Sequence, residues 1–259
     1  MKDLMGRAAL VTGGGRGIGA ATALALARRG ASVAVVARNM DQVVEVAAQL
    51  RHEGFEAFAF RCDVARPFDV RDVTLAAREA MGRVDILVNN AGTAPSNPLK
   101  RVTLEEWNHV MAVNATGTFL FTQKVLPEMV DNGWGRVVNV ASIAGLVGGK
   151  YISAYAASKH AVVGFTRAVA AEVDGSGVTV NAVCPGYVDT PLTDESVGRI
   201  VNLTGKSTDE ARKLLLDQAG QGRLITATEV AEAVVALCVE GSASANGEAV
   251  VLDGKDGRV

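Results

Sequence analysis

The chain reads AALVTGGGRGIGAATALALARRGASVAVVA over residues 8–37, and its architecture follows from this stretch. Residues 8–11 form a short apolar run that leads directly into glycines. The Ala- and Leu-rich segment 20–29 predicts a helix that ends at Gly30, and residues 32–37 are a second continuous apolar run. A strand, a glycine turn, a helix and a second strand within about thirty residues indicate the βαβ unit of a parallel sheet.

Apolar runs and helical segments keep alternating to the end of the chain. The runs are almost wholly apolar, as burial on both faces of a sheet requires, so the pattern predicts an α/β fold with a doubly wound, parallel, seven-stranded sheet (a Rossmann fold) and helices on both faces. No repeat or linker divides the chain, and we expect a single domain over residues 1–259 with a substrate lid at about 191–224. The expected strands are 8–11, 32–37, 57–60, 84–88, 135–140, 178–183 and 249–252, and the expected helices include 20–29, 40–51, 67–81, 103–129, 153–173 and 226–238.

The composition excludes several classes of protein. Of the 259 residues, 49% are apolar and 21% are charged, which is typical of a globular chain with a sizeable core. The net charge is −2 and there is no basic run, so we expect neither nucleic acid nor a membrane surface as a partner. No stretch approaches the roughly 20 apolar residues of a membrane span, and the first residues do not resemble a signal peptide. Cys62, Cys184 and Cys238 fit no metal-ligand spacing, so we expect reduced thiols, a cytoplasmic protein and no metal.

Gly13, Gly17 and Gly19 stand between the first expected strand and the first expected helix. Glycines at these places allow a tight turn, close approach of the backbone to a pyrophosphate, and close packing of the helix on the strand. The helix N-terminus then offers amide groups and a favourable dipole to phosphates. We therefore interpret this segment as a dinucleotide site rather than as an ordinary connection.

The end of the second strand bears on the choice of dinucleotide. An acidic residue there would bind the ribose 2′-hydroxyl of NAD, but this chain has Arg38 followed by Asn39. A guanidinium can hold a 2′-phosphate with two N–H groups, and Arg16 could join it, so we predict NADP(H) rather than NAD(H). Two solvated arginines are the alternative. Asp63, together with Val64, is placed to meet the adenine ring, unless Asp63 only caps a helix.

A second group of residues carries acid–base chemistry. Tyr155 and Lys159 are four positions apart, so in a helix they lie on one face, one turn apart. A Lys cation beside a phenol favours the phenolate and lowers a pKa that starts near 10, which would make Tyr155 a usable general acid or base. Ser142 belongs to a different element and could hydrogen-bond the same substrate oxygen.

Together these motifs resemble those of the short-chain dehydrogenase/reductase family in its single-domain form. The resemblance spans the whole chain, in the family's order, and implies an NAD(P)-dependent oxidoreductase that transfers a hydride between nicotinamide and a ketone or secondary alcohol. It rests on Thr12–Gly13 with Gly17–Ile18–Gly19, on Asn89–Asn90–Ala91–Gly92, on Asn114, Ser142, Tyr155 and Lys159, and on Pro185–Gly186 followed by Thr190.

The resemblance also implies roles for single residues. Tyr155 would be the catalytic acid or base, Ser142 would hold and polarise the substrate oxygen, and Lys159 would bind the nicotinamide ribose and lower the Tyr155 pKa. Asn114 would anchor a water that connects Lys159 to solvent, with a helix-packing amide as its alternative role. The expected cofactor-binding residues are Gly13, Gly15, Arg16, Gly17, Ile18, Gly19, Arg38, Asn39, Asp63, Val64, Asn90, Ala91, Gly92, Tyr155, Lys159, Pro185, Gly186, Val188 and Thr190.

For the substrate, the pattern resembles 3-oxoacyl reductases and polyketide ketoreductases. The first expectation is therefore NADPH-dependent reduction of a 3-oxoacyl thioester, bound to CoA or a carrier protein, or of a polyketide-like ketone. An NAD-linked secondary-alcohol or 3-hydroxybutyrate-type dehydrogenase is the alternative, and a non-catalytic redox sensor is a remote one. Surplus apolar residues in the expected helices 103–129 and 153–173 indicate a subunit interface, and the resemblance implies a homotetramer or homodimer.

Overall fold

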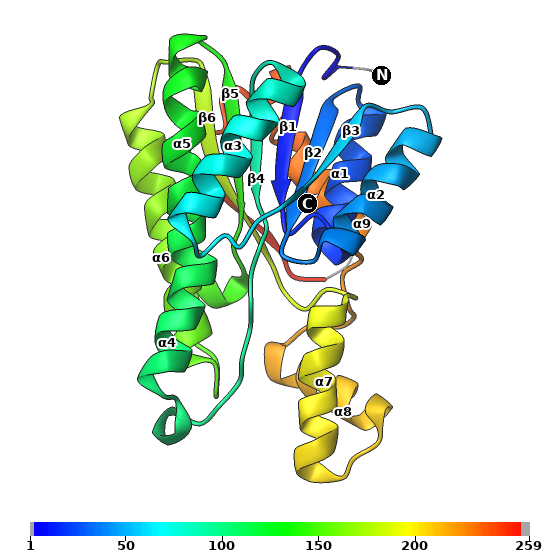
Figure 1. Ribbon diagram of the computed structural model, residues 1–259. Coiled ribbons are helices and arrows are strands. Elements are labelled where there is room, and N and C mark those ends of the chain that lie inside the picture. Colours follow the sequence, from blue (N-terminus) through cyan, green and yellow to red (C-terminus); the bar gives the residue numbers. More distant parts are fainter. Residues whose placement is uncertain (1–2, 255–259) are drawn as a thin grey trace.

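The computed structural model describes residues 3–254 and contains a seven-stranded sheet in which neighbouring strands are parallel (Figure 1). The strands lie in the order β3-β2-β1-β4-β5-β6-β7, which confirms the predicted doubly wound sheet. Their bounds are β1 Ala8–Thr12, β2 Ser32–Ala37, β3 Ala57–Arg61, β4 Ile86–Asn89, β5 Gly135–Val140, β6 Val178–Pro185 and β7 Ala249–Leu252.

Helices cover both faces of this sheet. Their bounds are α1 Gly17–Arg28, α2 Met40–His52, α3 Pro67–Met81, α4 Leu104–Met111, α5 Gly117–Asp131, α6 Ser153–Glu172, α7 Pro191–Thr204, α8 Thr208–Ala219 and α9 Ala227–Ala236, with short turns η1 Leu99–Arg101, η2 Ala112–Thr116, η3 Ile143–Gly145 and η4 Glu240–Ser242. α1, α2 and α9 pack on one face, while α3, α5 and α6 pack on the other (Figure 1).

Successive residues of the central strands enter opposite cores. Val11 and Val88 belong to the core shared with α1, α2 and α9, whereas Leu10 and Leu87 belong to the core shared with α3, α5 and α6. All four are fully buried. Because side chains alternate along a strand, a strand covered on both faces must be apolar at every position. This is why the strands appear in the sequence as continuous apolar runs.

The helix expected over residues 103–129 is not continuous, and the prediction is wrong in this respect. The α-helical pattern stops after α4, passes through the π-helical turn η2, and resumes in α5. Within η2, Asn114 turns its side chain to the backbone of Thr93. The backbone carbonyl oxygen of Asn114 accepts a hydrogen bond from Thr118 Oγ1 at 2.9 Å. Single π-turns of this kind are frequent at functional sites.

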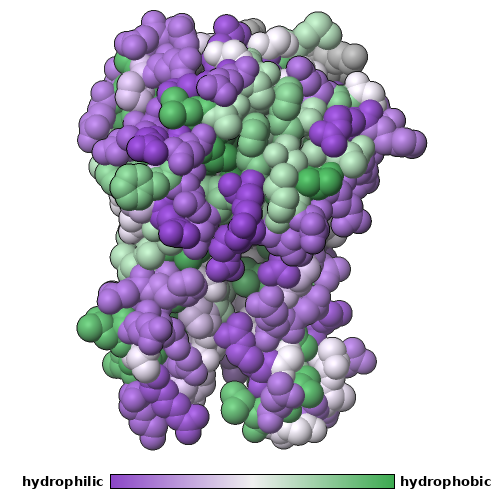
Figure 2. All heavy atoms as spheres, in the orientation of Figure 1, coloured by the Kyte–Doolittle hydropathy of each residue, from purple (hydrophilic) through white to green (hydrophobic). Residues whose placement is uncertain are grey.

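The strand order reverses between β1 and β4, and the carboxyl ends of these strands therefore border a crevice where ligands bind in such folds. Two parts of the chain extend beyond this edge of the sheet: α4 with its flanking loops, and the pair α7 and α8 (Figure 1). α7 and α8 share a small core around Val197, Ala211 and Leu215. The space-filling view shows the molecule hollowed between these two parts (Figure 2).

Candidate active site

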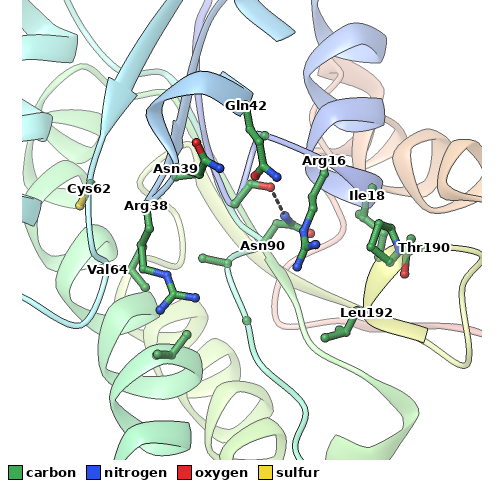
Figure 3. Close-up of a pocket in the computed structure, with 18 of the residues that line it drawn as sticks. Arg16, Ile18, Arg38, Asn39, Gln42, Cys62, Val64, Asn90, Thr190 and Leu192 are labelled. Carbon is green, nitrogen blue, oxygen red and sulfur yellow. Dashed lines mark hydrogen bonds between the residues drawn. The ribbon is translucent and has the colours of Figure 1, made fainter. Parts of the chain in front are cut away.

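A cavity of about 590 Å³ opens at the carboxyl ends of β1 to β4, where the strand order reverses (Figure 3). The glycine turn forms one wall, the segments after β2 and β3 form another, and the loop after β4 and the start of α7 complete it. The lining residues are Gly13, Gly15, Arg16, Gly17, Ile18, Ala37, Arg38, Asn39, Gln42, Cys62, Asp63, Val64, Asn90, Ala91, Gly92, Val113, Thr190, Pro191 and Leu192.

Two polar side chains hold the glycine turn against the end of β4. Thr12 Oγ1 accepts hydrogen bonds from the backbone N–H groups of Asn90 and Ala91 at 3.0 and 3.1 Å. Asn90 Nδ2 donates to the carbonyl oxygens of Thr12 and Gly13 at 3.0 and 3.1 Å (Figure 3). Gly13 has a φ of +63°, and a Cβ on Gly19 would overlap the Gly13 carbonyl oxygen, so both positions require glycine. Gly19 packs helix against turn and does not itself line the cavity.

The cavity is lined by two arginines, one with a guanidinium that is unpaired among the described residues and one in an ion pair. The guanidinium of Arg38 points into the cavity, and within residues 3–254 it forms no hydrogen bond or ion pair (Figure 3). Arg16 lines the same cavity, but its Nη2 pairs with Glu195 Oε1 of α7 at 3.2 Å. Asn39 caps α2, since its Oδ1 accepts a hydrogen bond from Asp41 N–H at 3.0 Å. Arg38 is thus the predicted arginine that is free to hold a phosphate.

Asp63 and Val64 line the cavity directly after β3, where the sequence predicts contacts with adenine. Asp63 Oδ1 accepts a hydrogen bond from Ala65 N–H at 3.1 Å and so fixes a turn. The N-cap of α3 is Arg66, not Asp63. The alternative role of Asp63 as a helix cap is therefore wrong.

Tyr155, Lys159 and Ser142 meet at the end of β5. Tyr155 and Lys159 lie in the first two turns of α6, and Ser142 follows β5 as the N-cap of η3. A side-chain hydrogen bond joins Ser142 and Tyr155, and Ser142 Oγ also donates to Pro185 O at 3.4 Å. Lys159 Nζ donates to Val140 O at 2.7 Å and lies 5.8 Å from the centre of the Tyr155 ring. The structure therefore brings these three predicted residues together, beside the cavity rather than in its lining.

Burial dominates the acid–base properties of this cluster. It raises the pKa of Tyr155 from 10.0 to about 12, although the hydrogen bond with Ser142 lowers it. It lowers the pKa of Lys159 from 10.5 to about 8. The predicted lowering of the Tyr155 pKa by Lys159 is wrong for this structure, because burial raises that pKa; the ammonium group itself is turned to the Val140 carbonyl. The phenol is consequently protonated at neutral pH and can donate a proton.

Asn114 ties two walls of the site together from a position that is only 1% exposed. Its Oδ1 accepts a hydrogen bond from Thr93 N–H at 2.8 Å, and its Nδ2 donates to Thr93 O and Ser158 Oγ, both at 2.9 Å. Ser158 Oγ in turn donates to Tyr155 O at 2.7 Å. Asn114 thus connects the loop after β4 to the first turn of α6. A water held by Asn114 stays a prediction.

Four of the predicted cofactor residues lie between the last residue of β6 and the N-cap of α7: Pro185, Gly186, Val188 and Thr190. Only the last of them lines the cavity. Beyond this turn, α7 reaches across the opening of the site, where Arg199 Nη2 donates to Ala94 O at 3.1 Å. With the Arg16–Glu195 ion pair, α7 thus has one polar contact to the glycine turn and one to the loop after β4.

Sequence reasoning missed several residues of the cavity. Gln42 lies on the first turn of α2, three positions after Asn39. It packs closely on the glycine turn, since a Cβ added to Gly15 would lie 2.9 Å from the Cβ of Gln42. That helical spacing was a usable signal, because it places Gln42 at the same helix end as the cap. The other missed lining residues are Ala37, Cys62, Val113, Pro191 and Leu192.

Among the described residues, no three His, Cys, Asp or Glu side chains gather in a way that could hold a metal ion. Over the same part of the chain, no helix has the length and apolar character needed to cross a membrane.

Known proteins share both the sequence pattern and the architecture. The family model for short chain dehydrogenase matches residues 7–203. The chain is 42% identical to the 3-oxoacyl-[acyl-carrier-protein] reductase of Synechocystis over 195 residues, which are 75% of this chain and 79% of that protein. It is 35% identical to the D-beta-hydroxybutyrate dehydrogenase of Cupriavidus necator over 252 residues, which are 97% of this chain and 98% of that protein. A crystal structure of a single-residue variant of actinorhodin polyketide ketoreductase with NADPH superimposes with a TM-score of 0.92, at 37% identity and over 98% of both chains.

Proposed function

The chain belongs to the short-chain dehydrogenase family, and from its site we propose that it is an NADPH-dependent ketoreductase. As a member of this family it is an oxidoreductase that uses a nicotinamide cofactor. The preferred cofactor, the direction of the reaction and the substrate are our proposals. The first two rest on the Tyr155 phenol, hydrogen-bonded to Ser142, beside a cavity that presents the free guanidinium of Arg38.

The residues present fit an NADP(H) molecule. The cavity lies at the N-terminus of α1, where backbone N–H groups and the helix dipole favour phosphates. Gly13 and Gly15 line the cavity, and a Cβ on either would collide with Asn90 or Gln42, so glycine lets the backbone of the turn follow this path along the cavity. Arg38 would hold the 2′-phosphate, and Asp63 and Val64 would border the adenine. The other residues proposed to hold the cofactor are Arg16, Gly17, Ile18, Gly19, Asn39, Asn90, Ala91, Gly92, Tyr155, Lys159, Pro185, Gly186, Val188 and Thr190.

In the proposed reduction, the bound cofactor supplies the hydride that adds to the carbonyl carbon. Ser142 Oγ and the Tyr155 phenol donate hydrogen bonds to the carbonyl oxygen, on which negative charge develops. Tyr155 then passes its proton to that oxygen. Lys159, with its Nζ 5.8 Å from the centre of the Tyr155 ring, would hold the nicotinamide ribose beside the phenol. Asn114 keeps the first turn of α6 in place through Ser158.

The state of the phenol supports the proposed direction. A pKa raised to about 12 keeps Tyr155 protonated at neutral pH, and a protonated phenol suits the reduction of a ketone. Oxidation of an alcohol would need the phenolate. This favours the reductase over the alternative of a secondary-alcohol or 3-hydroxybutyrate-type dehydrogenase, a possibility to which the similarity to the Cupriavidus enzyme also points.

We propose a 3-oxoacyl thioester or a polyketide-like ketone as the substrate. The similarity to the Synechocystis reductase and to the polyketide ketoreductase supports this class. The test is the absorbance of NADPH at about 340 nm during incubation with 3-oxoacyl-CoA, bicyclic ketones and simple ketones. Faster consumption with the first two groups is expected. Turnover of 3-hydroxybutyrate with NAD⁺, without reduction of any ketone, would support the dehydrogenase instead.

The proposed preference for NADPH rests on Arg38 and can be tested there. Arg38→Asp should raise the KM for NADPH by about 10- to 100-fold, because two charge-assisted hydrogen bonds to the 2′-phosphate are lost. The KM for NADH should change little or fall. Arg61→Asp is the matched control, because this exposed arginine ends the neighbouring β3 and lies outside the cavity lining. An unchanged ratio of the two KM values in Arg38→Asp would contradict the proposal.

We further propose that residues 3–254 form one catalytic unit and that 191–224 act as its substrate lid. The two contacts of α7 across the site opening support the lid.

We also propose that the chain assembles as a homotetramer. Exposed aromatic surface supports the assembly: Phe119 of α5 is 41% exposed and stacks edge-on against Phe165 of α6, with ring centres 6.2 Å apart. Light scattering after size-exclusion chromatography would distinguish a tetramer from a dimer or a monomer.

A further inference from the structure

Gln221 lies at the exit of the proposed lid, directly after α8 and Gly220, and its side chain has not been given a role. It is only 6% exposed, whereas Gln218, one turn earlier, is exposed. A buried glutamine is uncommon, because its amide must find hydrogen-bond partners to offset its desolvation. Those partners show what the residue does.

The Gln221 amide bonds to the turn between β6 and α7. Its Oε1 accepts a hydrogen bond from Tyr187 N–H at 2.8 Å, and its Nε2 donates to Tyr187 O at 2.8 Å. Nε2 also donates to Arg223 O at 2.6 Å. One side chain therefore satisfies both backbone groups of a residue that is 34 positions away in the sequence.

The position of Gln221 explains why a side chain is needed there. Gly186 N–H still donates to Leu252 O, the last residue of β7, at 2.8 Å. Tyr187 is the next residue of the turn, beyond the end of that strand, and the Gln221 amide takes the place of a further strand residue beside it. A backbone N–H left without a partner here would cost free energy.

The turn is also shaped to receive this amide. A Cβ on Gly186 would overlap Gln221 Oε1 and lie 3.1 Å from its Cδ, while the next nearest atom, Ile143 Cδ1, would be 3.4 Å away. The close approach of Gln221 is thus what requires glycine at position 186.

Backbone hydrogen bonds beside Gln221 join the two ends of the lid. Val188 and Ile225 form a parallel bridge, in which Ile225 N–H donates to Tyr187 O at 3.0 Å and Asp189 N–H donates to Ile225 O at 2.8 Å. Gln221 lies four residues before Ile225, beside this bridge, so the helices α7 and α8 extend from the sheet on a fixed base (Figure 1).

We propose that Gln221 is a positioning residue, which holds the turn Gly186–Tyr187–Val188 in the conformation that receives the nicotinamide half of the cofactor. This inference rests on the proposed function, which places that turn beside the nicotinamide. It predicts that loss of the amide weakens binding of the nicotinamide half and slows hydride transfer, while the adenine half binds as before.

The test compares two ligands on the full-length protein. NADPH reaches the turn, whereas adenosine 2′,5′-bisphosphate carries only the adenine half. Gln221→Met keeps the shape of the side chain and removes its hydrogen bonds. It should raise the Kd of NADPH and lower kcat by about tenfold or more, and leave the Kd of the bisphosphate within about twofold. Gln218→Met, at an exposed position of α8, should change neither Kd nor kcat.

A second variant keeps the test informative if Gln221→Met folds poorly. Gly186→Ala pushes the amide away from the opposite side, and it should cause the same selective loss of NADPH affinity. In a Gln221→Ala background the overlap is gone, so adding Gly186→Ala should change NADPH affinity little. An equal loss in both backgrounds would overturn the proposal. So would an unchanged Kd and kcat for NADPH in Gln221→Met, or an equal loss for both ligands, which would indicate a general structural role.

Amide hydrogen exchange separates this inference from the proposed function. If the wild-type protein binds neither ligand, the proposed function fails. Gln221→Met must still speed exchange in peptides covering residues 185–189 by about tenfold more than in peptides from β5, because the protected Tyr187 N–H loses its acceptor. Equal exchange in the two variants at positions 221 and 218 would show that Gln221 does not hold the turn.

Discussion

Replacing Lys159 with methionine should make the protein more stable at neutral pH while abolishing its activity. Lys159 is 5% exposed, and within residues 3–254 its ammonium group has a hydrogen bond to Val140 O but no ion pair with a carboxylate. A buried charge without a partner of opposite sign is costly, and the protein tolerates it for the sake of the site. Methionine has a similar length and carries no charge.

The size of the effect follows from the Lys159 pKa. Burial lowers this pKa from 10.5 to about 8, and the difference corresponds to about 3 kcal/mol against the charged form in the folded protein. Loss of the hydrogen bond to Val140 offsets about 1 kcal/mol of the gain. Lys159→Met should therefore raise the free energy of unfolding by about 2 kcal/mol at pH 7.

The dependence on pH carries a definite sign. Between pH 8 and 10.5 the unfolded chain keeps the Lys159 proton while the folded protein loses it, so wild-type stability from this group rises with pH. The variant lacks this rise. Its advantage should shrink by about 2 kcal/mol between pH 8 and 9.5.

Urea unfolding at a fixed protein concentration, followed by circular dichroism at several pH values from 7 to 9.5, measures both quantities. Lys124→Met, on the exposed surface of α5, serves as the control and should show no such dependence on pH. A Lys159→Met variant that is less stable than the wild type at pH 7, or whose stability difference is constant across this range, would show that burial of the Lys159 charge does not destabilise the protein.

Two further substitutions test the parts of the site that the fold holds in place. Gly19→Ala should destabilise the protein by about 1–3 kcal/mol and abolish NADPH binding, because the added Cβ overlaps the glycine turn. Gly148→Ala is the control and should be neutral, since its Cβ meets no heavy atom within 4 Å. Thermal unfolding and nucleotide titration measure the two effects, and equal effects in both variants would contradict the role of close packing at Gly19. Asn114→Leu removes both hydrogen bonds to Thr93, so it should lower the free energy of unfolding by about 1–3 kcal/mol and kcat by about tenfold or more. Asn108→Leu, at an exposed position, should change neither quantity. An unchanged kcat in Asn114→Leu would mean that the η2 turn does not support catalysis.

Much of the fold was predictable because it depends on local periodicity. Continuous apolar runs separated by helical segments predict the parallel sheet, and the glycine turn predicts the end of the sheet at which the cavity lies. Arg38 could be assigned because the position after β2 has a defined place in such folds. These inferences need only residues that are close in the sequence.

The remaining features depend on contacts between distant residues. The direction of the Tyr155 pKa is set by burial, which no spacing reveals. The break of the long helix at η2 follows from a bond between Asn114 and a backbone 21 positions away. The contact of Gln221 with the turn after β6 spans 34 positions. In each case the sequence contains the residue but not its partner.

The proposed mechanism requires that the protonated phenol of Tyr155 delivers the proton to a ketone reduced with NADPH. Tyr155→Phe removes that proton and little else, so the direct measurement is the rate of NADPH consumption with a 3-oxoacyl-CoA or a bicyclic ketone, together with the Kd of NADPH. We expect kcat to fall by about 100-fold or more, since positioned acids contribute about that much, while the Kd stays within about threefold. Turnover by Tyr155→Phe within about tenfold of the wild-type rate would contradict the account.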